Sequence, residues 1–299
     1  MTAQVTRPTL LAFLRRLGLT SAEPPGVDAL TRLHRAFVER VPYETIEIQL
    51  NRPTAVDAGA SLARILNGRG GYCFHLNGAF GLVLRALGYH VTRHLGGVQT
   101  TARSPEVINR HHLALTVRDL PGSTDIWLVD AGLGDGLHSP LPLRAGSYRQ
   151  GPFTFALTPS TIAPGGWRLA LDPRGSLHAM NFDPAPARMA DFAERHHHLS
   201  TSPGSGFVRT FSAQRTDAHG WDTLRALTLS RTEEITKKTV LDRRTDWLAA
   251  LADVFGLTLS PADAEALWRK VNAQHEAHLA THARATHAAR NAPTGPPTR

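Results

Sequence analysis

One short stretch limits what this chain can fold into more than any other: Arg69-Gly70-Gly71-Tyr72-Cys73-Phe74-His75-Leu76-Asn77. It contains the only cysteine of the 299 residues. Apolar residues with helical spacing follow it as far as Leu87, and Gly88 ends the pattern. The sequence therefore predicts a loop with two glycines that opens into a buried helix, with Cys73 in the first turn.

The position of Cys73 in a first helical turn favours a reactive thiol. Unpaired backbone N–H groups and the positive end of the helix dipole stabilise a thiolate there, and such surroundings lower a cysteine pKa from about 8.5 to roughly 3.5–7.5. A lone cysteine is more often a small, unreactive buried side chain. A nucleophile needs a histidine and an Asn or Asp elsewhere in the chain.

Two further stretches supply these partners. A histidine opens the strand-like run His111–Val117, and an aspartate ends the strand-like run Ile126–Asp130 before a Gly-x-Gly turn. If the two strands are antiparallel neighbours, His112 lies opposite Asp130. The aspartate then accepts from one imidazole nitrogen, and the other nitrogen faces the thiol of Cys73. Each residue alone has a structural explanation, but together they predict a catalytic triad.

These stretches resemble the arylamine N-acetyltransferase family, whose motifs have the forms R-G-G-[FY]-C-x-x-x-N, H-x-x-L-x-V and W-x-V-D-x-G-x-G. The segment 41–44, Val-Pro-Tyr-Glu, is similar to the family's P-F-E-N segment. Residues 199–207 are similar to its S-T-x-P-x-S-x-F segment, so that the resemblance covers about residues 8–272. It implies that Cys73, His112 and Asp130 are catalytic.

The pattern of apolar residues predicts a multi-domain α+β chain. Residues 1–88 read as a helical bundle that carries the cysteine, and 89–190 as an antiparallel β-barrel or sheet with the histidine and the aspartate. Residues 191–272 form an α/β lid, and 273–299 a disordered, basic, His-rich tail. The family has the same order of parts, with a papain-like Cys-His-Asp triad between the first two.

Boundaries within these parts follow from turn residues and caps. The expected strands are 91–95, 112–117, 126–130, 153–157, 167–171, 177–180, 208–213, 223–228 and 237–241. Asp28 is expected to cap the second helix, and Ser260-Pro261 to cap and begin the last.

Composition excludes several classes of protein. Hydrophobic residues at 41% and charged residues at 19% are ordinary for a globular protein. The net charge of +8 comes from scattered arginines without a nucleic-acid motif, so no nucleic-acid partner is expected, while a local basic patch would suit the phosphates of coenzyme A. One cysteine fits a reducing compartment. With neither a signal peptide nor a membrane anchor indicated, the expected location is the cytoplasm.

The resemblance implies a ping-pong acetyl transfer. Acetyl-CoA is the acyl-donor co-substrate, no cofactor is bound permanently, and an arylamine or arylhydrazine accepts the acetyl group from Cys73. No metal is expected, because the consecutive histidines His196, His197 and His198 cannot converge on one ion. They are expected on the lid surface, with His198 near the ligand.

The resemblance also suggests binding residues. Gly132 and Gly134 would border the coenzyme A cleft, and an aromatic pocket would consist of Tyr43, Tyr72, Leu133 and Phe207. Three positions depart from the family pattern: Leu133 replaces a phenylalanine, His75 a glutamate and Thr45 an asparagine. Strand alternation would turn His111 away from the site.

Three other functions remain compatible with these residues. Relatives act as amide synthases that release and cyclise a polyketide chain from a carrier protein. A Cys-His-Asp triad also serves thiol hydrolases. A non-catalytic homologue that only binds ligands would keep the fold with an unreactive thiol.

Overall fold

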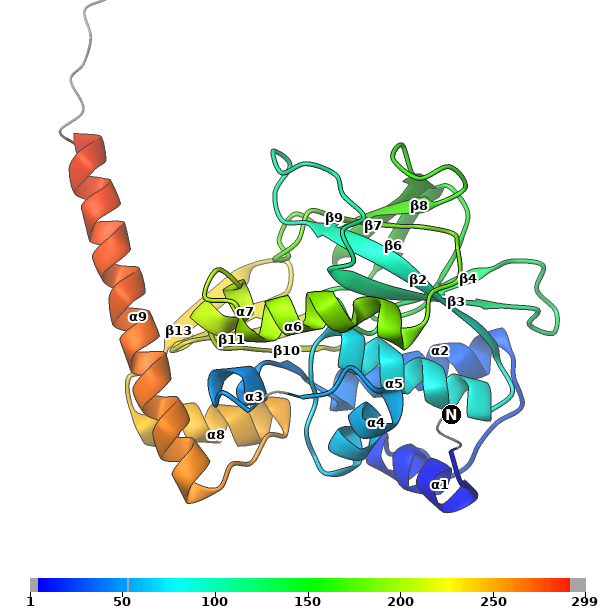
Figure 1. Cartoon of the computed structure of the whole chain (residues 1–299), viewed down its shortest axis with the longest axis horizontal. Coiled ribbons are helices and arrows are strands. Elements are labelled where there is room, and N and C mark those ends of the chain that lie inside the picture. The colour runs from blue at the N-terminus through cyan, green and yellow to red at the C-terminus, as the bar shows by residue number, and fades with distance from the viewer. Residues whose placement is uncertain (1–4, 53, 291–299) are drawn as a thin grey trace, which may run out of the picture.

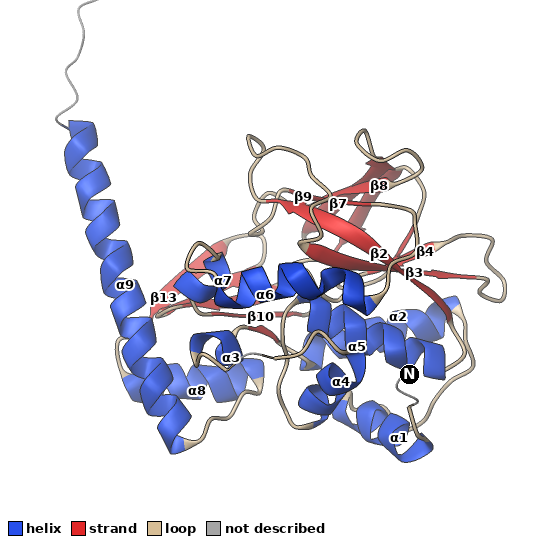
Figure 2. Ribbon diagram, viewed as in Figure 1, coloured by secondary structure: helices blue, strands red, loops and turns tan. Residues whose placement is uncertain are grey.

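The computed structural model describes residues 5–52 and 54–290. Helices form the N-terminal part, an eight-stranded antiparallel sheet curls into a near-closed barrel, and a second sheet with helices forms the C-terminal part (Figures 1 and 2). The predicted α+β class and the order of its parts are therefore confirmed.

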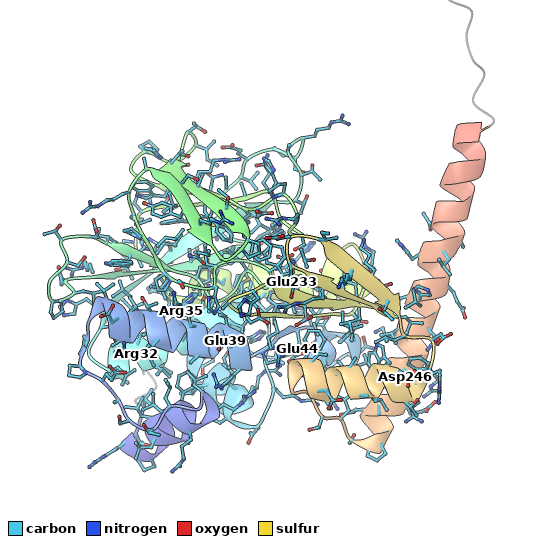
Figure 3. The ribbon with its side chains drawn as sticks, turned by 180° about the vertical axis from the view of Figure 1, so that it is seen from behind. Arg32, Arg35, Glu39, Glu44, Glu233 and Asp246 are labelled. Carbon is cyan, nitrogen blue, oxygen red and sulfur yellow. The ribbon has the colours of Figure 1, made fainter. Side chains whose placement is uncertain are left out.

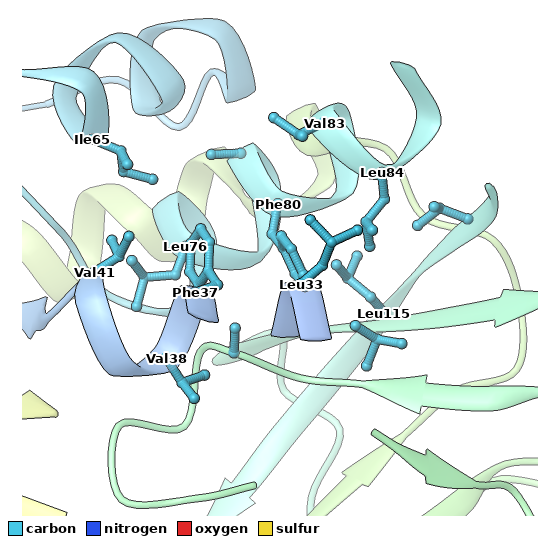
Figure 4. Packing of buried hydrophobic residues seen from close by; sticks show 14 of the residues in the cluster. Leu33, Phe37, Val38, Val41, Ile65, Leu76, Phe80, Val83, Leu84 and Leu115 are labelled. Atoms are coloured by element: carbon cyan, nitrogen blue, oxygen red, sulfur yellow. The ribbon is translucent and has the colours of Figure 1, made fainter. Parts of the chain in front are cut away.

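The N-terminal part is built around the helix that begins at Cys73. Its helices are α1 (Arg7–Arg16), α2 (Val27–Arg40), α3 (Ile46–Gln49), α4 (Ala58–Leu66) and α5 (Cys73–Ala86). Helix α5 is buried on nearly all sides, and Phe80 packs on Phe37 of α2 with ring centroids 4.7 Å apart (Figure 4). The prediction that Asp28 caps this helix is wrong, because α2 begins at Val27, after Gly26, and Asp28 lies in its first turn.

The barrel contains every strand from β2 to β9. These are β2 (His90–Gln99), β3 (His112–Arg118), β4 (Trp127–Val129), β5 (Leu141–Pro142), β6 (Gly146–Gln150), β7 (Phe153–Pro159), β8 (Trp167–Ala170) and β9 (Ala179–Phe182), in the order β5-β4-β3-β2-β9-β8-β7-β6. Helix α5 packs against β2 and β3. Strand β6 escaped sequence prediction because its exposed, polar residues carry no apolar alternation.

The C-terminal sheet includes two residues from the N-terminal part. Its order is β1 (Tyr43–Glu44), β10 (Ser212–Thr216), β11 (Trp221–Arg225), β12 (Thr228–Thr232) and β13 (Thr236–Val240). The C-terminal part also contains the helices η1 (Met189–Phe192), α6 (Ala193–Thr201), α7 (Gly206–Arg209), α8 (Arg244–Phe255) and α9 (Pro261–Arg290). The strand predicted over 223–228 is wrong, because a turn with Ala226 at φ 47° separates β11 from β12.

Trp221 ties the C-terminal sheet to the barrel. Its ring stacks on Phe153 of β7 with centroids 3.7 Å apart, and it belongs to the apolar core inside the barrel. This contact therefore joins strand β11 of the C-terminal sheet to strand β7 of the barrel.

The last helix is longer than the sequence pattern predicts. Pro261 begins α9, and the Ser260 hydroxyl accepts from the Asp263 N–H at 3.2 Å, which confirms the predicted cap. The boundary expected at residue 272 falls inside the helix, because alanines, which favour helix, continue it beyond the last core contact at Val271 (Figure 1). The prediction for residues 291–299 lies outside the described residues. None of the described helices is apolar over a length that would cross a bilayer.

Candidate active site

The loop before Cys73 is held by a buried carboxylate. The Glu44 N–H donates to the Gly71 carbonyl at 2.9 Å, and a Glu44 carboxylate oxygen accepts from the Gly70 N–H at 3.3 Å (Figure 3 labels Glu44). Gly71 has φ +155°, and a Cβ on Gly70 would lie 1.8 Å from a neighbouring carbonyl. Only glycines therefore allow the turn that brings Cys73 to the start of α5.

His75 caps this helix in place of the family's glutamate. Its Nδ1 accepts from the Tyr72 N–H at 3.4 Å, and its Nε2 pairs with the Thr54 hydroxyl at 3.0 Å. Burial, with the nearby Arg64 and His196, lowers the pKa of His75 to about 3, so the ring is neutral. The departure from the family pattern thus keeps the acceptor of a capping box but removes its negative charge.

Strand pairing brings His112 and Asp130 together, and the two strands are antiparallel neighbours as predicted. Leu115 pairs with Val129, and extending this register places Asp130 opposite Ala114. His112 is two residues from Ala114 on the same face of β3. The two side chains meet in the buried interior, with His112 Nε2 2.6 Å from Asp130 Oδ2.

The imidazole of His112 connects the carboxylate to the sulfur. Burial alone would lower the pKa of His112, but the charge of Asp130 and hydrogen bonds to Asp130 and Cys73 outweigh it and raise the pKa to about 10. Because Nε2 is occupied by Asp130, Nδ1 is left for Cys73. The Cys73 thiol also contacts the carbonyl of His111 at 3.5 Å. The arrangement therefore places an imidazole that keeps its proton at neutral pH beside the sulfur of Cys73.

Asn77 is a site residue to which sequence reasoning gave no role. It lies one helical turn after Cys73 and is fully buried. Its Nδ2 donates to Asp130 Oδ1 at 2.8 Å and to the Leu113 carbonyl at 2.6 Å, while its Oδ1 accepts from the Ala131 N–H at 2.9 Å. The i, i+4 spacing from the cysteine could have revealed it, because such residues share one helix face.

A cleft of about 270 Å³ opens above the cysteine. The predicted residues that line it are Tyr43, Cys73, His112, Gly132, Leu133 and Phe207. Sequence reasoning missed its apolar walls and its cation, which are Val98, Leu177, Leu199 and Arg225. These come from four separate elements or loops, and only Leu199 lies next to a segment that resembles a family motif.

Three predicted binding residues lie elsewhere. Among the described residues, Tyr72, Gly134 and His198 are not part of the cleft lining. Tyr72 is buried behind Phe207, with ring centroids 5.0 Å apart. Gly134 has φ +75° and packs tightly on the side chain of Gln214.

The histidine clusters also differ from expectation. His111 lines the cleft, because β3 begins only at His112 and strand alternation does not reach it. Burial, then Arg195 and His198, lower the pKa of His111 to about 4. His196 is not on the surface: it is buried on the inner side of α6, where its ring hydrogen-bonds Tyr72 Oη and the Thr54 carbonyl.

The surroundings of Gly132 leave no room for a side chain, so we predict that Gly132→Ala lowers both the stability of the protein and the reactivity of Cys73. A Cβ there would lie 2.8 Å from the Cα of Cys73 and 2.8 Å from Asn77 Nδ2. Overpacking of this kind costs about 1–3 kcal/mol. We expect a lower melting temperature and slower alkylation of Cys73 by iodoacetamide. Gly146→Ala is the control, because its Cβ would meet only Tyr148, at 3.9 Å; equal behaviour of both variants would contradict the prediction.

The raised pKa of His112 predicts how thiol reactivity depends on pH. The imidazolium loses its proton only as the pH rises through about 10, so the alkylation rate of Cys73 should be nearly constant between about pH 6 and pH 9. In His112→Gln the rate at pH 6.5 should fall about 100-fold, because an ordinary thiol with pKa 8.5 is about 1% ionised there.

The exposed pair His90–Asp119, with 2.9 Å between Nδ1 and Oδ2, supplies the control for that experiment, His90→Gln. This variant should keep the flat profile. A wild-type rate that climbs tenfold per pH unit below pH 8 would show that no ion pair exists.

The chain is similar to several known proteins. A family model described as N-acetyltransferase matches residues 26–264. The arylamine N-acetyltransferase of Mycolicibacterium smegmatis is 32% identical over 203 residues, which cover 66% of this chain and 72% of that protein. The arylamine N-acetyltransferase / N-hydroxyarylamine O-acetyltransferase of Salmonella typhimurium is 35% identical over 146 residues, 48% of this chain and half of that relative's length. Proansamycin X synthase of Amycolatopsis mediterranei is 29% identical over 124 residues, 40% of this chain and 46% of that enzyme.

Solved structures extend the likeness over nearly the whole fold. The arylamine N-acetyltransferase of M. smegmatis has a TM-score of 0.79 at 27% identity, covering 88% of this chain and 98% of that one. The Mycobacterium marinum enzyme in complex with CoA has a TM-score of 0.75 at 25% identity, covering 88% and 98%. The chain therefore belongs to the arylamine N-acetyltransferase family.

Proposed function

We propose that this protein transfers an acetyl group from acetyl-CoA to the nitrogen of an arylamine or arylhydrazine through an acetyl-cysteine intermediate on Cys73. The observation that carries the proposal is the contact of His112 with both Cys73 and Asp130 beneath an apolar cleft. Membership of the family supports the acyl-transfer chemistry.

In the first half-reaction the Cys73 thiolate attacks the thioester carbonyl. A new C–S bond forms, the bond to coenzyme A breaks, and the imidazolium of His112 gives its proton to the departing thiolate. Exchange of one thiolate for another is nearly thermoneutral, which is why cysteine suits this donor. The backbone N–H of Cys73, at the start of α5, has no helical acceptor and is available to the oxyanion.

In the second half-reaction an amine attacks the acetyl-cysteine. The nitrogen forms the amide bond, the bond to the sulfur breaks, and His112 takes the proton that the amine loses. The side chain of Asp130, hydrogen-bonded to His112, stabilises the imidazolium that results. The site then regains its original ion pair, as ping-pong kinetics require.

The lining of the cleft fits an aromatic acceptor. Val98, Leu177, Leu199 and Phe207 supply apolar walls. Leu133 offers an aliphatic contact where the family pattern has a phenylalanine, so we expect a ring to stack on Phe207 rather than at the glycine turn.

Intact-protein mass spectrometry tests the proposal. The protein is incubated with acetyl-CoA and then given a panel of anilines, hydrazines and aliphatic amines. We expect one acetyl group on the protein, removed by anilines and hydrazines with formation of the amide. Removal by water at the same rate would indicate a hydrolase, and failure to acylate would indicate a binding protein.

Amide synthesis on a carrier-bound chain is the second candidate, favoured by the similarity to proansamycin X synthase. It predicts that a thioester on a carrier protein acylates Cys73 faster than acetyl-CoA does. The two donors, compared at equal concentration in the same assay, distinguish the candidates.

A further inference from the structure

Two buried histidines outside the triad lie around the tyrosine that precedes Cys73. His75 of α5 is 1% exposed and His196 of α6 is 7% exposed. Their ring centroids lie 4.7 Å and 5.8 Å from that of Tyr72. None of these three side chains is part of the cleft lining, so they act on the site only through their neighbours.

The hydrogen bonds of His196 determine which of its nitrogens carries the proton. Nε2 lies 2.6 Å from the Thr54 carbonyl oxygen, and a carbonyl can only accept, so Nε2 is the donor. Burial lowers the pKa of His196 and outweighs the hydrogen bond to Thr54, so the ring is neutral at pH 7. In a neutral imidazole the other nitrogen is an acceptor. Nδ1 therefore accepts the hydrogen of the Tyr72 hydroxyl.

Tyr72 is held at both of its ends. Its backbone N–H donates to Nδ1 of His75 at 3.4 Å, and its carbonyl accepts from the Leu76 N–H at 3.0 Å. Its hydroxyl, at the far end of the side chain, donates to His196. The position of the ring between these attachments is thereby fixed.

Phe207, which lines the cleft, packs against the ring of Tyr72. The centroids of these two rings are 5.0 Å apart, and Tyr43 meets Phe207 edge to face with centroids 6.3 Å apart. Phe207 belongs to α7, a helix of four residues that follows α6 along the chain (Figure 1). So short a helix is marginal by itself. The orientation of Phe207 therefore depends on the rings packed against it.

We propose that His196 is a positioning residue for the acceptor: by holding the Tyr72 hydroxyl, it fixes the ring that orients Phe207. The inference rests on the proposed function, in which the ring of an arylamine stacks on Phe207. The triad does not depend on this link, because Asn77 and not His196 supports Asp130. His196 should therefore affect the binding of an aromatic acceptor and not the reactivity of the thiol.

Four variants separate the hydrogen bonds of His196 from its packing. His196→Leu removes both hydrogen bonds of the imidazole. Tyr72→Phe removes only the hydroxyl, and the family motif R-G-G-[FY]-C admits phenylalanine at this position. His196→Gln keeps one donor and one acceptor, since a glutamine amide has both. His197→Leu is the control, because His197 is exposed on the same helix.

The test compares aniline with hydrazine, an acceptor that has a reactive nitrogen but no ring. Steady-state kinetics are measured at saturating acetyl-CoA. We expect His196→Leu and Tyr72→Phe to raise the KM for aniline about fivefold, the order that an aligned aromatic pair contributes. The kcat for both acceptors and the KM for hydrazine should not change, because the weakened contact binds the ground state and the transition state equally. His196→Gln and His197→Leu should behave like the wild type.

Two further measurements distinguish positioning from a general loss of structure. The rate of Cys73 alkylation by iodoacetamide should be the same in all four variants and the wild type. A merely structural role would lower the folded fraction, and with it the kcat for both acceptors and the alkylation rate together. If His196→Leu does not fold, Tyr72→Phe alone decides, since it removes a single oxygen atom.

Equal changes with both acceptors, or an unchanged KM for aniline in Tyr72→Phe, would overturn the inference. A fivefold rise of this KM in His196→Gln would do the same, because the hydrogen bonds would then not be what positions the ring. Acetylation of aniline and hydrazine by the wild type would in these cases still support the proposed function. If the wild type acetylates neither acceptor, the proposed function fails and the inference falls with it.

Discussion

Cys73→Ala yields a folded protein that takes up no acetyl group from acetyl-CoA. The chain has no other thiol, and no hydroxyl can replace it, because a serine or threonine beside an imidazolium stays protonated. We expect the rate of acetyl transfer to fall to the background without enzyme, and the covalent adduct to disappear from the mass spectrum.

Folding and chemistry can be separated in this variant. Cys73 is the first residue of α5 and is buried. Removal of one sulfur atom costs about 1 kcal/mol, so the melting temperature should change little. Cys73→Ser, which fills the same space, should be equally inactive. An acetyl group found on Cys73→Ala would place the nucleophile elsewhere and end the proposed mechanism.

Asp130→Asn lowers the rate of acetyl transfer by about 10⁴-fold, the effect of the same change in a Ser-His-Asp triad. The carboxylate accepts from three donors, namely His112 Nε2, Asn77 Nδ2 and the Gly132 N–H at 2.9 Å. An asparagine has one acceptor oxygen and an NH₂ group, so it must either turn a donor toward His112 or leave another donor unpaired. It also carries no charge to stabilise the imidazolium.

The control is Asp119→Asn, which alters the exposed His90–Asp119 pair. Asp119 has φ 58°, a conformation that asparagine also adopts. Its rate should equal that of the wild type. If Asp130→Asn retains more than about a tenth of the activity, orientation of His112 by the carboxylate does not contribute as proposed.

The sequence allowed prediction of the site where local patterns decide the structure. The glycine pair and the apolar run specify the loop and helix that carry Cys73, and strand pairing follows from two apolar runs that end at Asp130. Asn77 could also have been predicted as a site residue, because it shares a helix face with the cysteine.

Other parts depend on contacts between distant segments. Strand β1 has two residues and therefore no periodicity, and it forms only because β10 offers it an edge. His196 is polar but buried, since Tyr72 and the Thr54 carbonyl supply its hydrogen bonds. Val98 and Leu177, which line the cleft, lie at the end of the barrel. Their separation along the chain does not predict how close the two residues lie in the fold.

The short strand β1 has a mechanical consequence. It is hydrogen-bonded on one side to the loop before Cys73, through Gly71, and on the other to β10, where Tyr43 is opposite Gln214. An outward hinge motion of the C-terminal sheet would break the hydrogen bonds of β1, the strand that also holds the loop before Cys73. A proteolytic cut between barrel and sheet should therefore leave the two pieces associated, because β1 pairs with both the loop before Cys73 and β10.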